Sequence, residues 1–176
     1  TLLIDSSTID VTTARAVVAD AEGAGLVAVD APVSGGIAAA VGGTLTFMVG
    51  GTEQAFARAE PLLEVMGRKI VHCGDAGNGQ AAKICNNMLL GVQMIAVSEA
   101  FVLGEKLGLD PQAFFDVAST SSGRCWALDT NCPVPGPVEG SRSTSRPLPG
   151  RPTGVGGPIP AKDTLGDCID CHACVN

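Results

Sequence analysis

Residues 26–36 have the sequence Leu-Val-Ala-Val-Asp-Ala-Pro-Val-Ser-Gly-Gly, a short apolar run that ends in an aspartate and a glycine turn. Short runs rich in Val, Ile and Leu, bounded by turn residues, are typical of buried β-strands. We expect strands at 2–5, 26–31, 45–49 and 70–73, and helices at 12–22 and 53–66. Gly23 and Gly25 are expected to end the first helix and Gly67 the second. This alternation predicts the second half of a Rossmann-type doubly wound α/β domain.

The pattern changes at Gly74, where a glycine-rich loop precedes a long helical segment. That segment, Gln80–Lys106, greatly exceeds the mean helix length of about 11–12 residues and suits a connection between domains. Asp110-Pro111 is expected to begin another helix, because Asp is a favoured N-cap and Pro a favoured first residue. The predicted organisation is a partial Rossmann-type domain at 1–76, a partial and truncated helical domain at 77–140, and a tail of different composition at 141–176.

The tail differs from the rest in composition. Residues 141–160 hold five prolines and four glycines, too little apolar surface to offset the entropy of ordering, so we predict disorder. Cys168, Cys171, His172 and Cys174 follow, and Cys-x-x-Cys-His is the haem attachment pattern, while three cysteines and a histidine also fit zinc or an iron–sulfur cluster. A metal- or haem-binding tail on a non-enzymatic remnant is the alternative from another class. Such a site needs a folded surround, so none is expected.

The overall composition restricts the partners. Hydrophobic residues make up 45% of the chain, and the net charge of −7 argues against nucleic acid, whose phosphates require clustered Lys and Arg. The most apolar stretch, 84–103, is interrupted by polar residues, so we expect a buried helix and no membrane span. Cys73, Cys85, Cys125 and Cys132 are expected to be reduced, buried thiols.

The Ser34-Gly35-Gly36 turn follows a predicted strand directly. Adjacent glycines let backbone N–H groups approach a ligand closely, and the serine hydroxyl adds a further donor. At the carboxyl end of a strand, such a turn suits a small carboxylate. On the residues alone, it more often forms a tight turn that binds nothing.

Lys83 and Asn87 are four residues apart on the long helix, so they lie on one face. Their neighbours on the helix are mostly apolar: Ala82, Ile84, Cys85, Met88 and Leu89. A partly desolvated lysine has a lowered pKa and can exchange a proton near neutral pH, and an asparagine amide can both donate and accept. On spacing alone, a lysine that extends to solvent beside a capping asparagine is the more common arrangement.

A resemblance to a known family adds to these motifs. The turn Asp5-Ser6-Ser7-Thr8 is weak alone, because hydroxyls there most often cap the next helix. In order, this turn, the Asp30–Gly36 segment, Gly77-Asn78-Gly79 with Lys83 and Asn87, and the Ser-Ser-Gly-Arg-Cys-Trp run at 121–126 resemble the β-hydroxyacid dehydrogenase family. Residues 121–126, followed by Pro-Val-Pro-Gly at 133–136, resemble its 3-hydroxyisobutyrate dehydrogenase branch. The resemblance extends from Thr1 to the region of Gly140.

The resemblance implies an enzyme that uses NAD to oxidise 3-hydroxyisobutyrate to methylmalonate semialdehyde in valine catabolism. Lys83 would exchange the proton of the hydroxyl, and Ser34, Gly35 and Gly36 would hold the carboxylate. Asn87 would position the substrate, and Thr8 would contact the cofactor near the nicotinamide. It also implies a homo-oligomer, located in the cytoplasm or, in a eukaryote, in the mitochondrial matrix.

Two departures from the family pattern lead to further expectations. The first strand, the glycine-rich phosphate turn and the acidic residue that separates NAD from NADP would precede Thr1, so we expect residues 1–176 alone to be inactive. Beyond Gly140, Lys162-Asp163 superficially matches a second cofactor lysine, but its surroundings are not helical and the role is not transferred. A reading-frame error would explain the tail. The alternative within the class is a sibling enzyme such as tartronate semialdehyde reductase, against which residues 121–126 argue.

Overall fold

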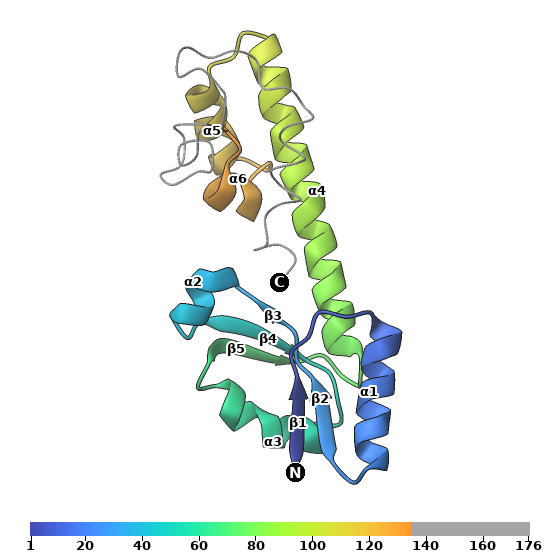
Figure 1. The fold of residues 1–176 in the computed structure, drawn as a ribbon. Coiled ribbons are helices and arrows are strands. Elements are labelled where there is room, and N and C mark those ends of the chain that lie inside the picture. The colour runs from blue at the N-terminus through green and yellow to red at the C-terminus, as the bar shows by residue number, and fades with distance from the viewer. Residues whose placement is uncertain (135–176) are drawn as a thin grey trace, which may run out of the picture. The chain divides into compact units, whose positions relative to one another are not determined.

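The computed structural model describes residues 1–134, which divide into two compact units between Asn87 and Met88, within one long helix. Figure 1 shows the elements in order along the chain. They are β1 (Leu2–Asp5), α1 (Val11–Gly23), β2 (Val27–Asp30), β3 (Val33–Ser34), α2 (Gly36–Val41), β4 (Leu45–Val49), α3 (Glu53–Leu63), β5 (Gly67–His72), α4 (Asn78–Lys106), α5 (Pro111–Thr120) and α6 (Trp126–Asn131). Each unit is described separately below.

The strands of the first unit form two small sheets that are joined at one point. β1 and β2 are parallel, with Asp5 opposite Asp30. β4 pairs with β3 in the antiparallel direction and with β5 in the parallel direction. A single bridge between Asp30 and Gly50 connects β2 to the end of β4, with N–O distances of 3.0 and 2.7 Å. The carboxyl ends of β1, β2 and β4 are therefore held together.

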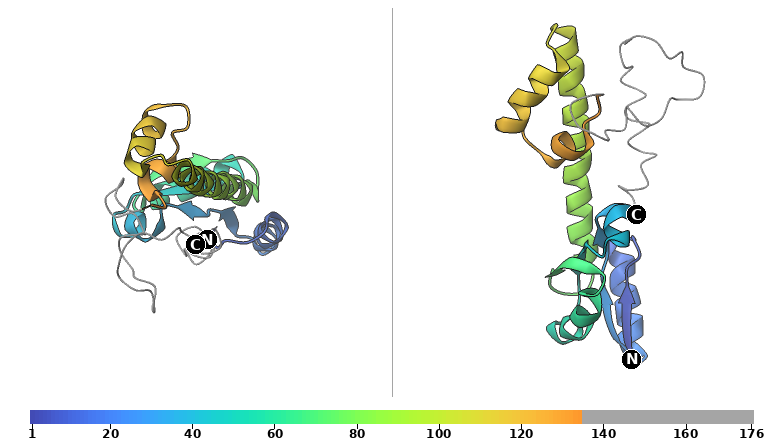
Figure 2. Two further views of the ribbon diagram at one scale, coloured as in Figure 1. Left: turned by 90° about the horizontal axis from the view of Figure 1, so that it is seen from above. Right: turned by 90° about the vertical axis from the view of Figure 1, so that its left-hand side faces the viewer.

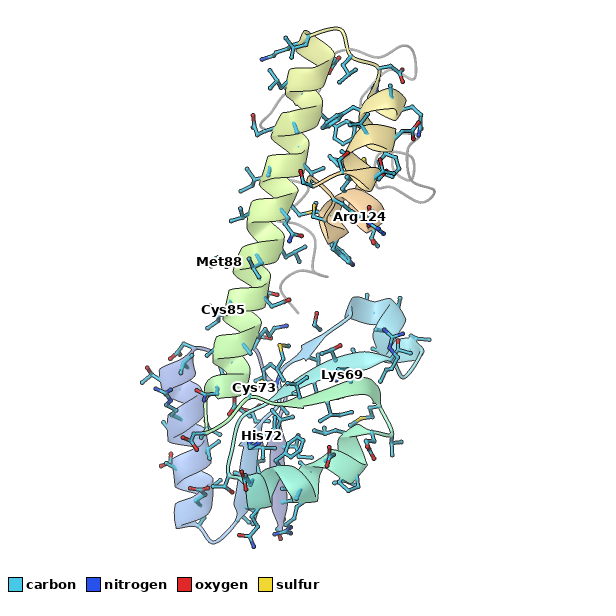
Figure 3. The ribbon with its side chains drawn as sticks, turned by 180° about the vertical axis from the view of Figure 1, so that it is seen from behind. Lys69, His72, Cys73, Cys85, Met88 and Arg124 are labelled. Atoms are coloured by element: carbon cyan, nitrogen blue, oxygen red, sulfur yellow. The ribbon has the colours of Figure 1, made fainter. Side chains whose placement is uncertain are left out.

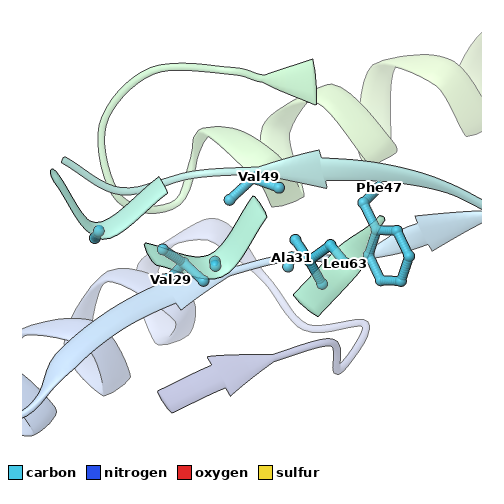
Figure 4. Packing of buried hydrophobic residues seen from close by; sticks show 7 residues of the cluster. Val29, Ala31, Phe47, Val49 and Leu63 are labelled. Carbon is cyan, nitrogen blue, oxygen red and sulfur yellow. The ribbon is translucent and has the colours of Figure 1, made fainter. Parts of the chain in front are cut away.

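Helices cover both faces of β2, as a doubly wound fold requires. Ala28 packs against Val18 and Ala21 of α1. The neighbouring residues Val29 and Ala31 face the other way and pack with Phe47, Val49 and Leu63 (Figure 4), in a cluster that also contains Ala55 and Ala59 of α3. Alternate residues of a strand point to opposite faces, so the apolar run at 26–31 supplies both layers. The expected Rossmann-type α/β fold is confirmed.

The second unit is helical. Met94, Val97 and Phe101 of α4 pack with Leu128 of α6 in one cluster, which Phe114 of α5 also joins. The rings of Phe101 and Phe114 meet edge to face, with centroids 4.8 Å apart. Figure 2 shows α5 and α6 beside this part of α4. The predicted start of α5 is confirmed, since Asp110 Oδ1 accepts a hydrogen bond from Ala113 N at 3.0 Å.

Several local expectations are wrong. β3, α2 and α6 were not anticipated; each spans two to six residues and is too short for a periodic pattern. Gly67 does not end the second helix, because α3 stops at Leu63 and Gly67 begins β5. A Cβ at Gly67 would lie 2.8 Å from Leu45 O and from the Phe47 ring, so close strand packing explains this glycine.

The long helix α4 is not buried as expected. Met88, Leu89 and Val92 are 63%, 58% and 61% exposed. By length and composition alone α4 is long and apolar enough to cross a bilayer, so the prediction of no membrane span stays a prediction. The four cysteines of the described part are free thiols, but only Cys132 is buried and Cys85 is exposed.

Candidate functional site

Asp30 anchors the start of α4 to the end of β2. Its carboxylate is 1% exposed, and it accepts hydrogen bonds from Gly77 N to Oδ1 at 2.6 Å and from Gln80 N to Oδ2 at 3.0 Å. The first N–H groups of a helix have no partner within the helix and carry partial positive charge, so a carboxylate there is stabilising. Asp30 was not among the expected site residues, although it lies within the motif that contains Ser34.

Two glycines allow this close approach. A Cβ at Gly79 would clash with Met48 O and would lie 2.7 Å from Asp30 Oδ2 and 2.9 Å from Asp30 O. A Cβ at Gly50 would clash with Asp30 Oδ1 and would lie 2.8 Å from Gly79 N. The obstructing atoms are mostly backbone, which cannot move aside without moving a strand. The first turn of α4 is thus fixed on β2 and β4.

Lys83 lies one turn farther along α4 and points inward. It is 3% exposed, and its Nζ donates a hydrogen bond to Val33 O at 2.6 Å. Burial lowers the pKa of Lys83, because the charged ammonium loses hydration. The expected desolvation is confirmed but its expected cause is wrong. The apolar neighbours Ile84 and Met88 are 51% and 63% exposed, and Figure 3 labels Met88 on α4.

Val33 directly precedes the Ser34–Gly36 turn, so the hydrogen bond to Val33 O places the Lys83 amine beside the start of this turn. Gly35 and Gly36 adopt φ values of +133° and +64°, which residues other than glycine rarely adopt. A Cβ at Gly35 would lie 2.5 Å from Ala39 Cβ. The turn is partly accessible, with Ser34 half-buried and Gly35 exposed. Asn87, also half-buried, follows Lys83 by one helical turn.

The Ser6–Thr8 turn at the carboxyl end of β1 is connected to the same helix. Ser6, Ser7 and Thr8 are all exposed, and Ser7 N donates to Asp5 Oδ1 at 2.9 Å. The interpretation of these hydroxyls as caps of α1 is wrong, because the Asp10 carboxylate caps it and accepts from Thr13 N at 2.9 Å. The hydroxyls are therefore available to a ligand.

Gln80 joins the Ser6–Thr8 turn to α4. Its side chain is 1% exposed, and Nε2 donates a hydrogen bond to Ser7 O at 2.6 Å. Sequence reasoning missed this residue, because glutamine near a helix start is common and its partner lies 73 residues earlier.

The expected absence of a metal site has no structural test in the tail. Within residues 1–134, no group of three or more His, Cys, Asp and Glu residues is placed to hold a metal ion. Cys168, Cys171, His172 and Cys174, together with Lys162 and the predicted disorder of 141–176, lie outside the described residues.

Two family models match consecutive parts of the chain. Residues 1–74 match the NAD binding domain of 6-phosphogluconate dehydrogenase. Residues 77–138 match the NAD-binding domain of NADP-dependent 3-hydroxyisobutyrate dehydrogenase. Together they cover both units of the described structure.

Individual relatives agree with the family models. The chain is 59% identical over 155 residues to a probable 3-hydroxyisobutyrate dehydrogenase of Mycobacterium tuberculosis, covering 88% of this chain and 53% of that protein. It is 54% identical over 144 residues to the mitochondrial 3-hydroxyisobutyrate dehydrogenase of Homo sapiens, covering 82% and 43%. The chain thus spans about half the length of the curated relatives it matches.

Solved structures give the same result. A structure of Mycobacterium tuberculosis 3-hydroxyisobutyrate dehydrogenase with L-serine has a TM-score of 0.81 and 55% identity, covering 98% of this chain and 58% of that one. A second, described as Psf3 in complex with NADP+ and 2-OPP, has a TM-score of 0.64 and 31% identity, covering 72% and 45%. By its motifs, its fold and its relatives, the chain belongs to the β-hydroxyacid dehydrogenase family, in the group of the 3-hydroxyisobutyrate dehydrogenases.

Proposed function

We propose that this chain carries the catalytic centre of a nicotinamide-dependent dehydrogenase that oxidises 3-hydroxyisobutyrate to methylmalonate semialdehyde, a step of valine breakdown. One observation carries the proposal: the buried amine of Lys83 is bonded to Val33 O, directly before the glycine turn at Ser34–Gly36. The proton acceptor is thus hydrogen-bonded to the residue that directly precedes the backbone donors for a carboxylate, although Lys83 and Val33 are 50 residues apart in the sequence. A 3-hydroxy acid has its hydroxyl and its carboxylate separated by two carbons, which suits two such neighbouring sites.

In this mechanism the Ser34–Gly36 turn binds the substrate carboxylate with N–H groups and the Ser34 hydroxyl. The neutral amine of Lys83 accepts the hydroxyl proton during oxidation, and its ammonium returns a proton during reduction. The amide of Asn87 orients the substrate beside Lys83. The Mycobacterium tuberculosis relative was solved with L-serine. L-serine is also a 3-hydroxy carboxylic acid, which supports this substrate class.

A nicotinamide cofactor fits the carboxyl edge of β1. In parallel α/β sheets ligands bind outside the carboxyl ends of the strands, and Thr8 follows β1 in an exposed turn whose hydroxyls cap no helix. Bound there, the cofactor would supply the hydride acceptor for the alcohol carbon. Residues 1–176 contain no Gly-x-Gly-x-x-Gly turn, the usual pyrophosphate site. Thr8 and its turn would therefore hold only the nicotinamide end.

We expect residues 1–176, expressed alone, to show no reduction of NAD in the presence of 3-hydroxyisobutyrate. The reason is the missing pyrophosphate contact, since a helix N-terminus supplies much of the phosphate affinity. Absorbance at the NADH wavelength over long incubations measures this. Turnover that disappears in Lys83→Ala would show that the expectation is wrong.

Activity itself is best tested in a full-length chimaera, in which residues 1–138 replace the aligned segment of the Mycobacterium tuberculosis relative. The chimaera is expected to oxidise 3-hydroxyisobutyrate faster than it reduces tartronate semialdehyde. The opposite preference would favour the sibling enzyme. Absence of both activities in a folded chimaera would contradict the proposal. Size-exclusion chromatography of the same protein tests the expected homo-oligomer.

The location is proposed from the relatives: the cytoplasm, from the bacterial one, or the mitochondrion, from the eukaryotic one.

The lowered pKa of Lys83 predicts a pH profile. Oxidation needs the neutral amine, so kcat in the chimaera should rise with pH through a pKa below the ordinary lysine value of 10.5. Reduction needs the ammonium, so its rate should fall over the same range. Lys83→Met should remove both slopes, and Lys106→Met, at an exposed position of α4, should keep them. Slopes that persist in Lys83→Met would assign the titration to another group.

A further inference from the structure

We propose that Gln80 is a positioning residue that holds the cofactor turn at Ser7–Thr8 in register with the proton-transferring Lys83. The proposal rests on the function proposed above and adds a residue to which no role in the reaction has been given. The central contact is the hydrogen bond from Gln80 Nε2 to Ser7 O at 2.6 Å.

Gln80 and Lys83 share a buried face of α4. They are three residues apart and are 1% and 3% exposed, so both side chains point into the first unit. One reaches the backbone of the turn after β1, and the other reaches Val33 O before the substrate turn. The same helical turn therefore contacts both loops that would hold the reactants.

The backbone of Gln80 is fixed as firmly as its side chain. Gln80 N donates to Asp30 Oδ2 at 3.0 Å, while Gly77 N donates to Asp30 Oδ1. Gly79, between them, is enclosed by Met48 O and Asp30 O. The backbone of Gln80 is thus held in place, and the hydrogen bond from its side-chain amide holds Ser7 O relative to it.

The Ser7–Thr8 turn has few other constraints on its position. Ser6, Ser7 and Thr8 are exposed. Within residues 1–134, the turn is held by two hydrogen bonds: Ser7 N donates to Asp5 Oδ1, within the same loop, and Gln80 Nε2 donates to Ser7 O. Oxidation removes a hydride from the alcohol carbon and a proton from its hydroxyl, so the nicotinamide and Lys83 must address adjacent atoms. A misplacement of about 1 Å can lower a rate by about a hundredfold.

The test compares Gln80→Met, which keeps the length but has no donor, with Gln80→Glu, which keeps the shape but presents an acceptor to Ser7 O. Gln54→Met, the same change at an exposed site on α3, is the matched control. All are made in the chimaera. Hydrogen exchange of the cofactor-free protein is followed in a peptide that covers residues 5–12.

We expect hydrogen exchange in that peptide to become about three- to tenfold faster in both Gln80 variants, which corresponds to the loss of one hydrogen bond. Exchange in a peptide that covers β4 should stay unchanged. We expect kcat to fall about ten- to a hundredfold, with KM for the hydroxy acid within about threefold because the carboxylate turn is not touched. The isotope effect with substrate deuterated at the alcohol carbon should rise, and the pH at which kcat increases should not move.

Wild-type kcat in a folded Gln80 variant would overturn the proposal. Loss of the folded state in both Gln80 variants would also overturn it, because Gln80 would then be purely structural. An inactive wild-type chimaera, or full activity in Lys83→Met, would instead contradict the proposed function. In that case the exchange result still decides whether Gln80 orders the turn.

Discussion

Lys83→Met in the full-length chimaera is expected to lower kcat for 3-hydroxyisobutyrate oxidation by about 10²- to 10⁴-fold, the range that general acid–base groups contribute. Methionine has a similar length but cannot exchange a proton. KM for the hydroxy acid should change little, because the carboxylate is bound by the Ser34–Gly36 turn. Steady-state kinetics with saturating cofactor measure both constants.

Stability separates this loss from misfolding. Lys83→Met removes the desolvation cost of a buried ammonium, which stabilises the protein, and also removes the hydrogen-bond donor to Val33 O, which destabilises it. The melting temperature should therefore stay within a few degrees. Lys69→Met, the same change at an exposed residue of β5, is the control and should keep wild-type kcat. A folded Lys83→Met with more than a tenth of wild-type kcat would contradict the assigned role.

Gly79→Ala is expected to destabilise the protein by about 2–4 kcal/mol, because overpacking against backbone costs more than against mobile side chains. The new Cβ would meet Met48 O and Asp30 O, so the start of α4 would have to move away from β2 and β4. That movement would also displace Lys83, and kcat of the remaining folded protein should fall. Urea unfolding of the chimaera, together with kinetics, measures both effects.

Gly91→Ala is a matched control on the same helix. A Cβ there has nothing within 4 Å, and Gly91 lies inside α4, where alanine favours the helix by about 0.5–1 kcal/mol. This variant should be slightly more stable and equally active. Equal stabilities of the two alanine variants would mean that the junction at Asp30 is looser than the structure shows.

The sequence predicted the elements that have a pattern of their own. β1 and β4 have the expected bounds, because each is a short apolar run bounded by polar or glycine residues. β3 was not predicted, because its two residues form a strand only through pairing with Thr46 and Phe47. α6 has no side-chain cap at Cys125 and only six residues, so it carries no start signal.

The site was predicted unevenly for the same reason. Lys83, Asn87 and the Ser34–Gly36 turn stand in local motifs that resemble a family. Asp30 and Gln80 have partners 47 to 73 residues away, and no local spacing reveals such pairs. The burial of Lys83 was expected from the apolar residues beside it, but Ile84 and Met88 are exposed. The side chain instead points inward and donates to Val33 O, which lies 50 residues earlier and which no local pattern reveals.

The most direct test is a crystal structure of the chimaera with 3-hydroxyisobutyrate and an unreactive nicotinamide analogue. We expect Lys83 Nζ to lie about 3 Å from the substrate hydroxyl, with the carboxylate on the amides of the Ser34–Gly36 turn. A substrate whose hydroxyl is bound by other residues, while Lys83 Nζ contacts only Val33 O, would contradict the proposed mechanism.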